Sequence, residues 1–149
     1  MSYEHLILRV MMKVMFPFIV LFALYVQFHG DYGPGGGFQA GVIFAVAFIL
    51  HALVFGLAAT KKALPQSALS AMMASGVLLY AGTGVVTMLL GGNLLGYDAL
   101  APNSTHHAGQ HYGIIVVELG VGLAVASTML TIFYLFAGRE PDIITDDDW

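Results

Sequence analysis

Four long apolar segments follow one another along the chain, separated by short polar or glycine-rich connections. Each segment holds about 20 mostly apolar residues, the length that an α-helix needs to cross the hydrocarbon core of a bilayer. The pattern predicts an all-α integral membrane protein, a bundle of four transmembrane helices that forms a single domain over residues 1–149. The predicted spans run from about Leu8 to Phe28, from Phe38 to Ala59, from Ser67 to Leu90 and from Ile114 to Phe136.

The basic residues all fall on one side of this predicted bundle. They are Arg9 and Lys13 near the start of the first span, Lys61 and Lys62 between the second and third, and Arg139 after the fourth. The other two connections, residues 29–37 and 91–113, contain no Lys or Arg. Because the excess of basic residues marks the cytoplasmic side of a membrane protein, both termini are predicted to be cytoplasmic.

Composition supports a membrane protein and excludes several other classes. Only 9% of the residues are charged, whereas an ordinary soluble domain carries about 25%. Five basic residues against nine acidic ones leave no basic patch for phosphates, so we expect no nucleic-acid partner. Cysteine is absent, which excludes disulfides and Cys-ligated metals. The acidic tail, residues 139–149, is interpreted as a solvated end or as a docking strip for a basic partner.

The first connection without basic residues is rich in glycine. It reads His29-Gly30-Asp31-Tyr32-Gly33-Pro34-Gly35-Gly36-Gly37-Phe38-Gln39-Ala40-Gly41. It matches neither phosphate-binding glycine motif and no strand precedes it, so phosphate binding is disfavoured. Glycine permits positive φ and close approach of another backbone. This glycine-rich turn (residues 33–41) is therefore either a tight, closely packed turn or a direct contact for a ligand or ion.

Small residues recur at a four-residue spacing inside three of the spans. Such faces let helices approach closely where lipid supplies no hydrophobic drive. Four helices cannot bury all of these faces among themselves, so we expect further helices from partner subunits. The positions are Gly37, Gly41 and Ala45 in the second span, Ala71 and Ser75 in the third, and Gly120 with Ala124 and Gly122 with Ala126 in the fourth.

Apart from Arg9 and Lys13 in the opening turns of the first span, the charged or imidazole side chains inside the apolar spans are Glu118 and His51. Glu118 lies about 7 Å below the predicted outer edge, at 1.5 Å per helical residue. A carboxylate there needs a partner or a proton, so it belongs either to a proton or cation path or to a structural hydrogen bond or inter-subunit pair. His51 lies about 14 Å deeper, too far for a direct hydrogen bond. It is either a neutral, hydrogen-bonded histidine or a proton-handling group.

The predicted outer face is rich in imidazole groups. His107 and His111 have the spacing of two metal ligands on one helix face, but no Glu follows His107 to complete a metalloprotease motif. We therefore expect no metal site and no cofactor. The outer histidines are interpreted as solvated or interface residues, or as groups that tune the charge of an entrance for cations. They comprise His29, next to Asp31, and His106, His107 and His111.

The run Tyr32-Gly33-Pro34-Gly35-Gly36-Gly37-Phe38-Gln39-Ala40-Gly41 resembles the signature of the MnhB/MrpB family, small subunits of Mrp-type (Mnh-type) multisubunit sodium/proton antiporters. That family shows a His near an Asn or Asp, then Pro-Gly-Gly-Gly-Phe, then a helix of small residues. Here the His and the acid are His29 and Asp31, slightly further from Pro34 than in many members. The segment Val117-Glu118-Leu119-Gly120-Val121-Gly122 resembles the family's last span. The resemblance covers nearly the whole chain.

The resemblance implies a small, non-enzymatic subunit, multi-pass in the inner (plasma) membrane and needed for assembly of the antiporter. Its partners would be the other subunits of an Mrp-type complex, the lipid bilayer, and the sodium ions and protons that cross the complex. Candidates for the ion pathway are Glu118, His51, His29 and Asp31. The alternative is an architectural subunit of a related hydrogenase-like or respiratory complex, without direct ion contact. A stand-alone enzyme that uses the histidines is disfavoured because no catalytic motif is present.

Overall fold

The computed structural model of the chain describes residues 3–30, 33, 35–102 and 108–139. Throughout these residues the regular structure is helical, which confirms the predicted fold class. Four of the helices are long and apolar enough to cross a membrane. Asp31, Pro34, His106, His107 and most of the acidic tail lie outside the described residues. The elements are α1 (Tyr3–His29), α2 (Gly37–Phe55), α3 (Leu57–Ala63), α4 (Gln66–Leu89), the 3-10 helix η1 (Tyr97–Leu100) and α5 (Ala108–Ala137).

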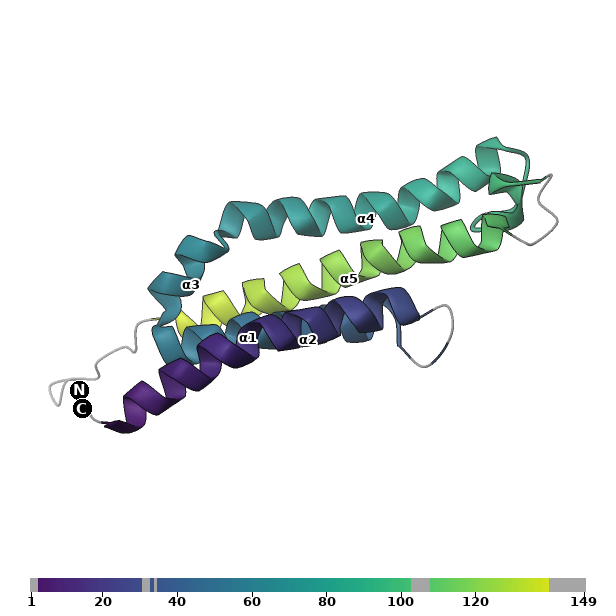
Figure 1. The fold of residues 1–149 in the computed structure, drawn as a ribbon. Coiled ribbons are helices and arrows are strands. Elements are labelled where there is room, and N and C mark those ends of the chain that lie inside the picture. Colours follow the sequence, from purple (N-terminus) through teal and green to yellow (C-terminus); the bar gives the residue numbers. More distant parts are fainter. Residues whose placement is uncertain (1–2, 31–32, 34, 103–107, 140–149) are drawn as a thin grey trace, which may run out of the picture.

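The four spanning helices lie side by side in a row, in which α5 lies between α4 and the pair formed by α2 and α1 (Figure 1). α5 packs against α4 on one side and α2 on the other, and α1 packs against α2. One end of the row, here named the glycine-turn end, holds the end of α1 and the start of α2. The opposite end, named the basic end, holds α3, the start of α1 and the end of α5, and with them all five basic residues. That this end faces the cytoplasm stays a prediction.

Two faces of small residues explain why α5 lies inside the row. Gly120 and Gly122 are two positions apart, about 200° around the helix, so they face opposite sides. On one side, a Cβ added at Gly76 of α4 would lie 2.6 Å from the carbonyl oxygen of Gly120. On the other, a Cβ at Gly41 of α2 would lie 2.7 Å from the carbonyl oxygen of Gly122. Backbone therefore meets backbone on both sides of α5, as expected where small residues form the interface.

The other small residues divide between core and surface. Ala45 of α2 is fully buried in one apolar cluster with Leu69 of α4. Ala124 of α5 packs on Gly76 of α4, together with Gly120. Ala71 and Ser75 of α4, which stand four residues apart, are both exposed. Successive residues of a helix are rotated by about 100°, so Gly76 faces α5 while the adjacent Ser75 points away from it.

The second span ends earlier than the sequence predicts. α2 stops before Gly56 and not at Ala59, because Gly56 adopts φ 94° and ψ 151°, which breaks the helix. The chain continues as α3, which is fixed against α5 at the basic end. The hydroxyl of Tyr134 donates to the carbonyl oxygen of Leu64 at 3.1 Å. The ammonium of Lys61 lies 5.6 Å from the centre of the Tyr134 ring, a cation–π arrangement.

Gly56→Ala is expected to destabilise the protein although the position is open. The backbone of Gly56 lies in a region that glycine alone adopts readily, so alanine costs about 1–3 kcal/mol there. Among the described residues, no heavy atom lies within 4 Å of a Cβ built at this position. The apparent melting temperature of the purified assembly measures the effect. The control is Gly82→Ala, at an equally open but helical position of α4. Equal melting temperatures would show that the break does not require this conformation.

The last spanning helix, α5, starts earlier than the predicted fourth span, at Ala108 instead of Ile114. Its first turns pack against η1, whose Tyr97 ring lies where a side chain at Gly113 would stand. Burial raises the pKa of the Tyr97 phenol above its ordinary value of 10.0, and the nearby Tyr80 raises it further. The Tyr97 ring packs directly against the backbone of α5 at Gly113.

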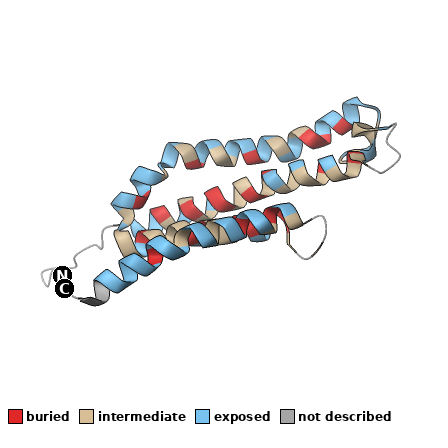
Figure 2. Cartoon of the chain, viewed as in Figure 1, coloured by how far each residue is buried: buried red, intermediate tan, exposed pale blue. Residues whose placement is uncertain are grey.

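Large apolar side chains stay exposed along the edges of the row (Figure 2). Only 11% of the most apolar stretch of α1 is buried, against 33% in the central α5. Apolar surface on this scale needs lipid or another protein against it. The exposure therefore fits a helix row that lies in a membrane.

Candidate functional site

Three glycines at the glycine-turn end contact Glu118: two lie against its carboxylate and the third lies against its backbone. A Cβ added at Gly30 would lie 2.5 Å from both carboxylate oxygens, and one at Gly36 would lie 2.7 Å from Oε1. A Cβ at Gly37 would overlap the backbone carbonyl of Glu118. We name Gly30, Gly36 and Gly37 the glycine cradle. The structure thus brings together Glu118 and the glycine-rich turn, which the sequence singled out separately.

The backbone of the cradle favours a negative charge at Glu118. Gly36 caps the start of α2 with φ 110°, a left-handed conformation that suits glycine. Its carbonyl accepts the first bond of the helix, from the N–H of Ala40 at 3.0 Å. The N–H groups before Ala40 have no acceptor within the helix, and the helix dipole adds positive partial charge there. A carboxylate beside this terminus is stabilised electrostatically.

His29 lies at the same end of the row, next to the cradle. Its ring stacks on Tyr25, with centroids 5.1 Å apart and an interplanar angle of 16°. A Cβ at Gly33 would lie 3.2 Å from its Nε2. The imidazole is therefore held between an aromatic ring and the glycine-rich turn. Asp31, its predicted companion, falls outside the described residues.

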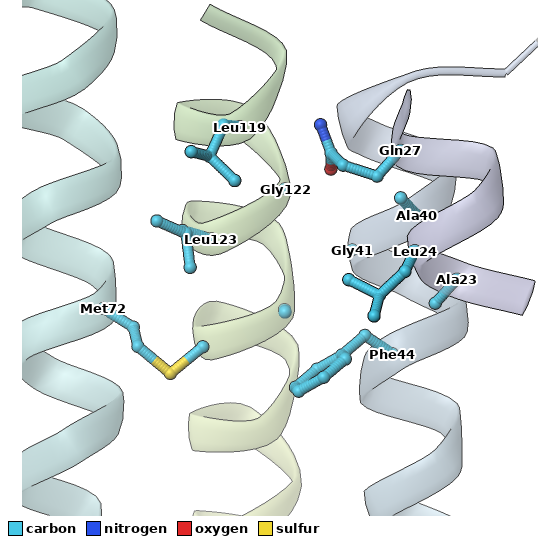
Figure 3. Close-up of a pocket in the computed structure, with 11 residues that line it drawn as sticks. Ala23, Leu24, Gln27, Ala40, Gly41, Phe44, Met72, Leu119, Gly122 and Leu123 are labelled. Carbon is cyan, nitrogen blue, oxygen red and sulfur yellow. The ribbon is translucent and has the colours of Figure 1, made fainter. Parts of the chain in front are cut away.

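An apolar pocket of about 110 Å³ lies between α1, α2, α4 and α5 (Figure 3). Its one polar lining residue is Gln27 of α1, whose side chain reaches toward Gly122 of α5 (Figure 3). Gln27 is 8% exposed, and the missing side chain at Gly122 makes room for its carboxamide. Gly122 follows Glu118 by one helical turn, so this amide lies one turn from the carboxylate. Sequence reasoning missed Gln27, although a polar amide inside an apolar span is itself a signal.

His51 lies at the basic end, away from Glu118. Its Nδ1 is 2.7 Å from Oγ1 of Thr60, and the Thr60 hydroxyl donates to the carbonyl oxygen of Gly56 at 3.3 Å. The Thr60 hydroxyl therefore links the His51 ring to the backbone at Gly56. The Thr60 contact was not foreseen, because it forms across the break at Gly56.

Metal ligands do not gather in the described part of the chain. No group of three or more His, Asp or Glu residues could hold an ion there. His111 lies on the first turns of α5 with its ring 6.1 Å from that of Tyr112. His107, its predicted partner, lies outside the described residues, so the expectation of no metal site stays a prediction.

Four helices that can span a membrane, with close backbone contacts on both sides of α5 and the Glu118 carboxylate against the glycine cradle, define a multi-pass membrane protein. Residues 7–131 match the family described as "Domain related to MnhB subunit of Na+/H+ antiporter". The match spans most of the chain, so the protein belongs to this family. The protein is a multi-pass protein of the bacterial plasma membrane.

Similar proteins cover nearly the same length. The chain is 31% identical over 142 residues to a Staphylococcus haemolyticus protein described as "Putative antiporter subunit mnhB2", with 94% of this chain and 99% of the relative covered. A Staphylococcus epidermidis protein of the same description is 33% identical, with 93% and 98% covered. One from Staphylococcus aureus is 29% identical, with 93% and 98% covered. These relatives agree with a transporter subunit and do not favour a hydrogenase-like complex.

Proposed function

We propose that Glu118, held by the glycine cradle, handles the transported proton or cation at the predicted outer entrance of an antiporter. As a member of its family, the chain is a subunit of a multisubunit Na⁺/H⁺ antiporter, with the other subunits as its partners. In this proposal the complex is of the Mrp type, and sodium ions and protons cross the assembly. The chain has no enzymatic activity of its own.

The enclosure of the Glu118 carboxylate by Gly30 and Gly36 carries the proposal. A carboxylate inside a spanning helix is unfavourable unless it is paired, protonated or in contact with water. This one is half-buried, and its oxygens lie beside Gly30 and Gly36 at the glycine-turn end. The positive start of α2 stabilises its charged form, while the spanning helix around it disfavours that form. Such opposing effects suit a group that exchanges a proton for a cation.

Glu118→Gln tests the proposal in everted membrane vesicles that carry the whole complex. The amide keeps the size of the side chain but loses the charge and the proton. Sodium-dependent proton antiport is expected to fall to about a tenth or less, since a proton-transferring group contributes about 10²-fold or more to a step that depends on it. A native gel is expected to show a normally assembled complex.

Asp98→Asn is the matched control, because it removes an acid in η1, outside the spanning helices. It is expected to retain antiport. The proposal is wrong if the Glu118→Gln complex assembles and transports like the unmodified one.

A second candidate is an architectural role, which the direct backbone contact between Gly37 and Glu118 favours. In that case the cradle joins α2 to α5, and the side chain of Glu118 is dispensable. Retained antiport in Glu118→Gln combined with loss of assembly in a cradle variant would identify this role.

A further inference from the structure

A groove at the basic end of the row has no part in the Glu118 site. It opens between α1 and α2 beside α3 and has a volume of about 600 Å³, within the ~300–1,000 Å³ range of ligand pockets. We name it the basic-end groove. Its lining includes Met12, Lys13 and Phe16 of α1 and Phe48, His51 and Phe55 of α2.

The walls of the groove suit a hydrocarbon chain. The Phe16 ring lies 5.2 Å from that of Phe48 and 5.7 Å from that of His51, and the Phe55 ring lies 4.7 Å from the His51 ring. Nδ1 of His51 is hydrogen-bonded to Thr60, and most of the surface that lines the groove is apolar. A polar ligand such as a sugar or nucleotide would leave its hydrogen-bonding groups unsatisfied here.

The rim of the groove is positively charged. Lys13 is exposed, and Arg9 lies four residues earlier on the same face of α1. Like charges at this spacing repel each other, so an anion between them is favourable. In the part of the chain whose side chains are described, the acids Asp98 and Glu118 lie at the opposite end of the row.

The depth of Lys13 matches a membrane interface. It precedes His29 by 16 residues, which corresponds to about 24 Å along α1. In a hydrocarbon core of about 30 Å, its long side chain reaches the headgroup layer at the basic end.

We propose that the basic-end groove binds one anionic phospholipid, with the phosphate at Lys13 and Arg9 and an acyl chain along the aromatic wall. Basic pockets between spanning helices on the cytoplasmic side are recognised sites for anionic headgroups. The occupant is a lipid because the groove joins an apolar wall to a cationic rim at headgroup depth. A helix of a partner subunit and the acidic tail of the chain itself are the competing occupants.

The lipid content of the intact purified complex tests the proposal. Phosphatidylglycerol that stays bound is counted by native mass spectrometry for Lys13→Gln, which removes the cation, and for Ala59→Phe, which fills the groove. Each variant is expected to lose one phosphatidylglycerol per copy of the chain. Lys62→Gln and Ala58→Phe, exposed positions of α3 that do not line the groove, are expected to lose none. Unchanged lipid counts in both groove variants would overturn the proposal.

A photoreactive phenylalanine analogue at Phe16 identifies the occupant without disturbing the charge. The complex is placed in phosphatidylethanolamine vesicles that contain a minority of phosphatidylglycerol. Adducts at Phe16 are expected to be several-fold richer in phosphatidylglycerol than those at Phe28, which is exposed at the other end of α1. Lys13→Gln is expected to abolish this enrichment. Cross-links from Phe16 to another subunit or to the chain's own tail, or lipid adducts in the bulk ratio, would contradict a phospholipid site.

Discussion

Gly37→Ala is expected to prevent stable assembly of the subunit and to abolish antiport with it. An alanine Cβ at this position would lie 2.8 Å from the carbonyl carbon of Glu118, in the backbone of a neighbouring helix. Backbone cannot rotate away as a side chain does, so α2 and α5 must separate. Overpacking lowers the stability of a protein by about 1–3 kcal/mol. Here it disrupts the contact between Gly37 and the backbone of Glu118. The measurements are the amount of complex on a native gel and its apparent melting temperature.

Gly33→Ala is the matched control in the same glycine-rich turn. Its Cβ would lie 3.2 Å from Nε2 of His29, the far end of a side chain that can shift. This variant is expected to assemble and to transport. If Gly37→Ala assembles as well as Gly33→Ala does, the close contact between α2 and Glu118 is not needed for the fold.

Gly76→Ala is expected to loosen α4 from α5 and to lower the stability of the complex by about 1–3 kcal/mol. The added Cβ would lie 2.6 Å from the carbonyl oxygen of Gly120 and 2.8 Å from the backbone nitrogen of Ala124. Gly82→Ala on the same helix is the control, because its Cβ meets nothing within 4 Å among the described residues. At position 82, alanine is expected to increase the stability of the complex by about 0.5–1 kcal/mol, since glycine inside a helix is less favourable than alanine. The two variants are compared by melting temperature.

A double substitution separates a local clash from a general loss of stability. Gly120→Ala places its Cβ 2.8 Å from the carbonyl oxygen of Gly76, so it opposes the same contact from the other side. Once one alanine has separated the helices, the second is expected to add little, and the combined loss is smaller than the sum. Strictly additive losses would show that the two glycines do not share one contact.

The sequence by itself determined the number of spans and the end at which the basic residues gather. Both are local properties, because a spanning helix satisfies its own backbone hydrogen bonds and partitions into lipid by its own composition. The helix ends were less predictable. At Gly56 a single backbone conformation ends α2, and at Ala108 the packing of Tyr97 extends α5. Neither cause appears in the hydrophobic pattern.

The sequence also singled out Glu118, since an acid in a spanning helix is conspicuous without any structure. It could not say that Gly30 and Gly37 surround that acid, because this depends on how far α2 slides along α5. The same holds for Thr60 beside His51 and for Gln27 beside Gly122. Each is a contact between helices, and spacing along one helix carries no information about its neighbour.

The row of helices was likewise decided by the tertiary structure. The sequence contains the pairs Gly120 with Ala124 and Gly122 with Ala126, and their offset already implies two opposite faces of α5. Only the structure shows that Gly76 meets one face and Gly41 the other. In lipid, helix association depends on close van der Waals packing and not on hydrophobic burial. The partner of each face is therefore fixed by the fit of two surfaces, which no single segment of the sequence contains.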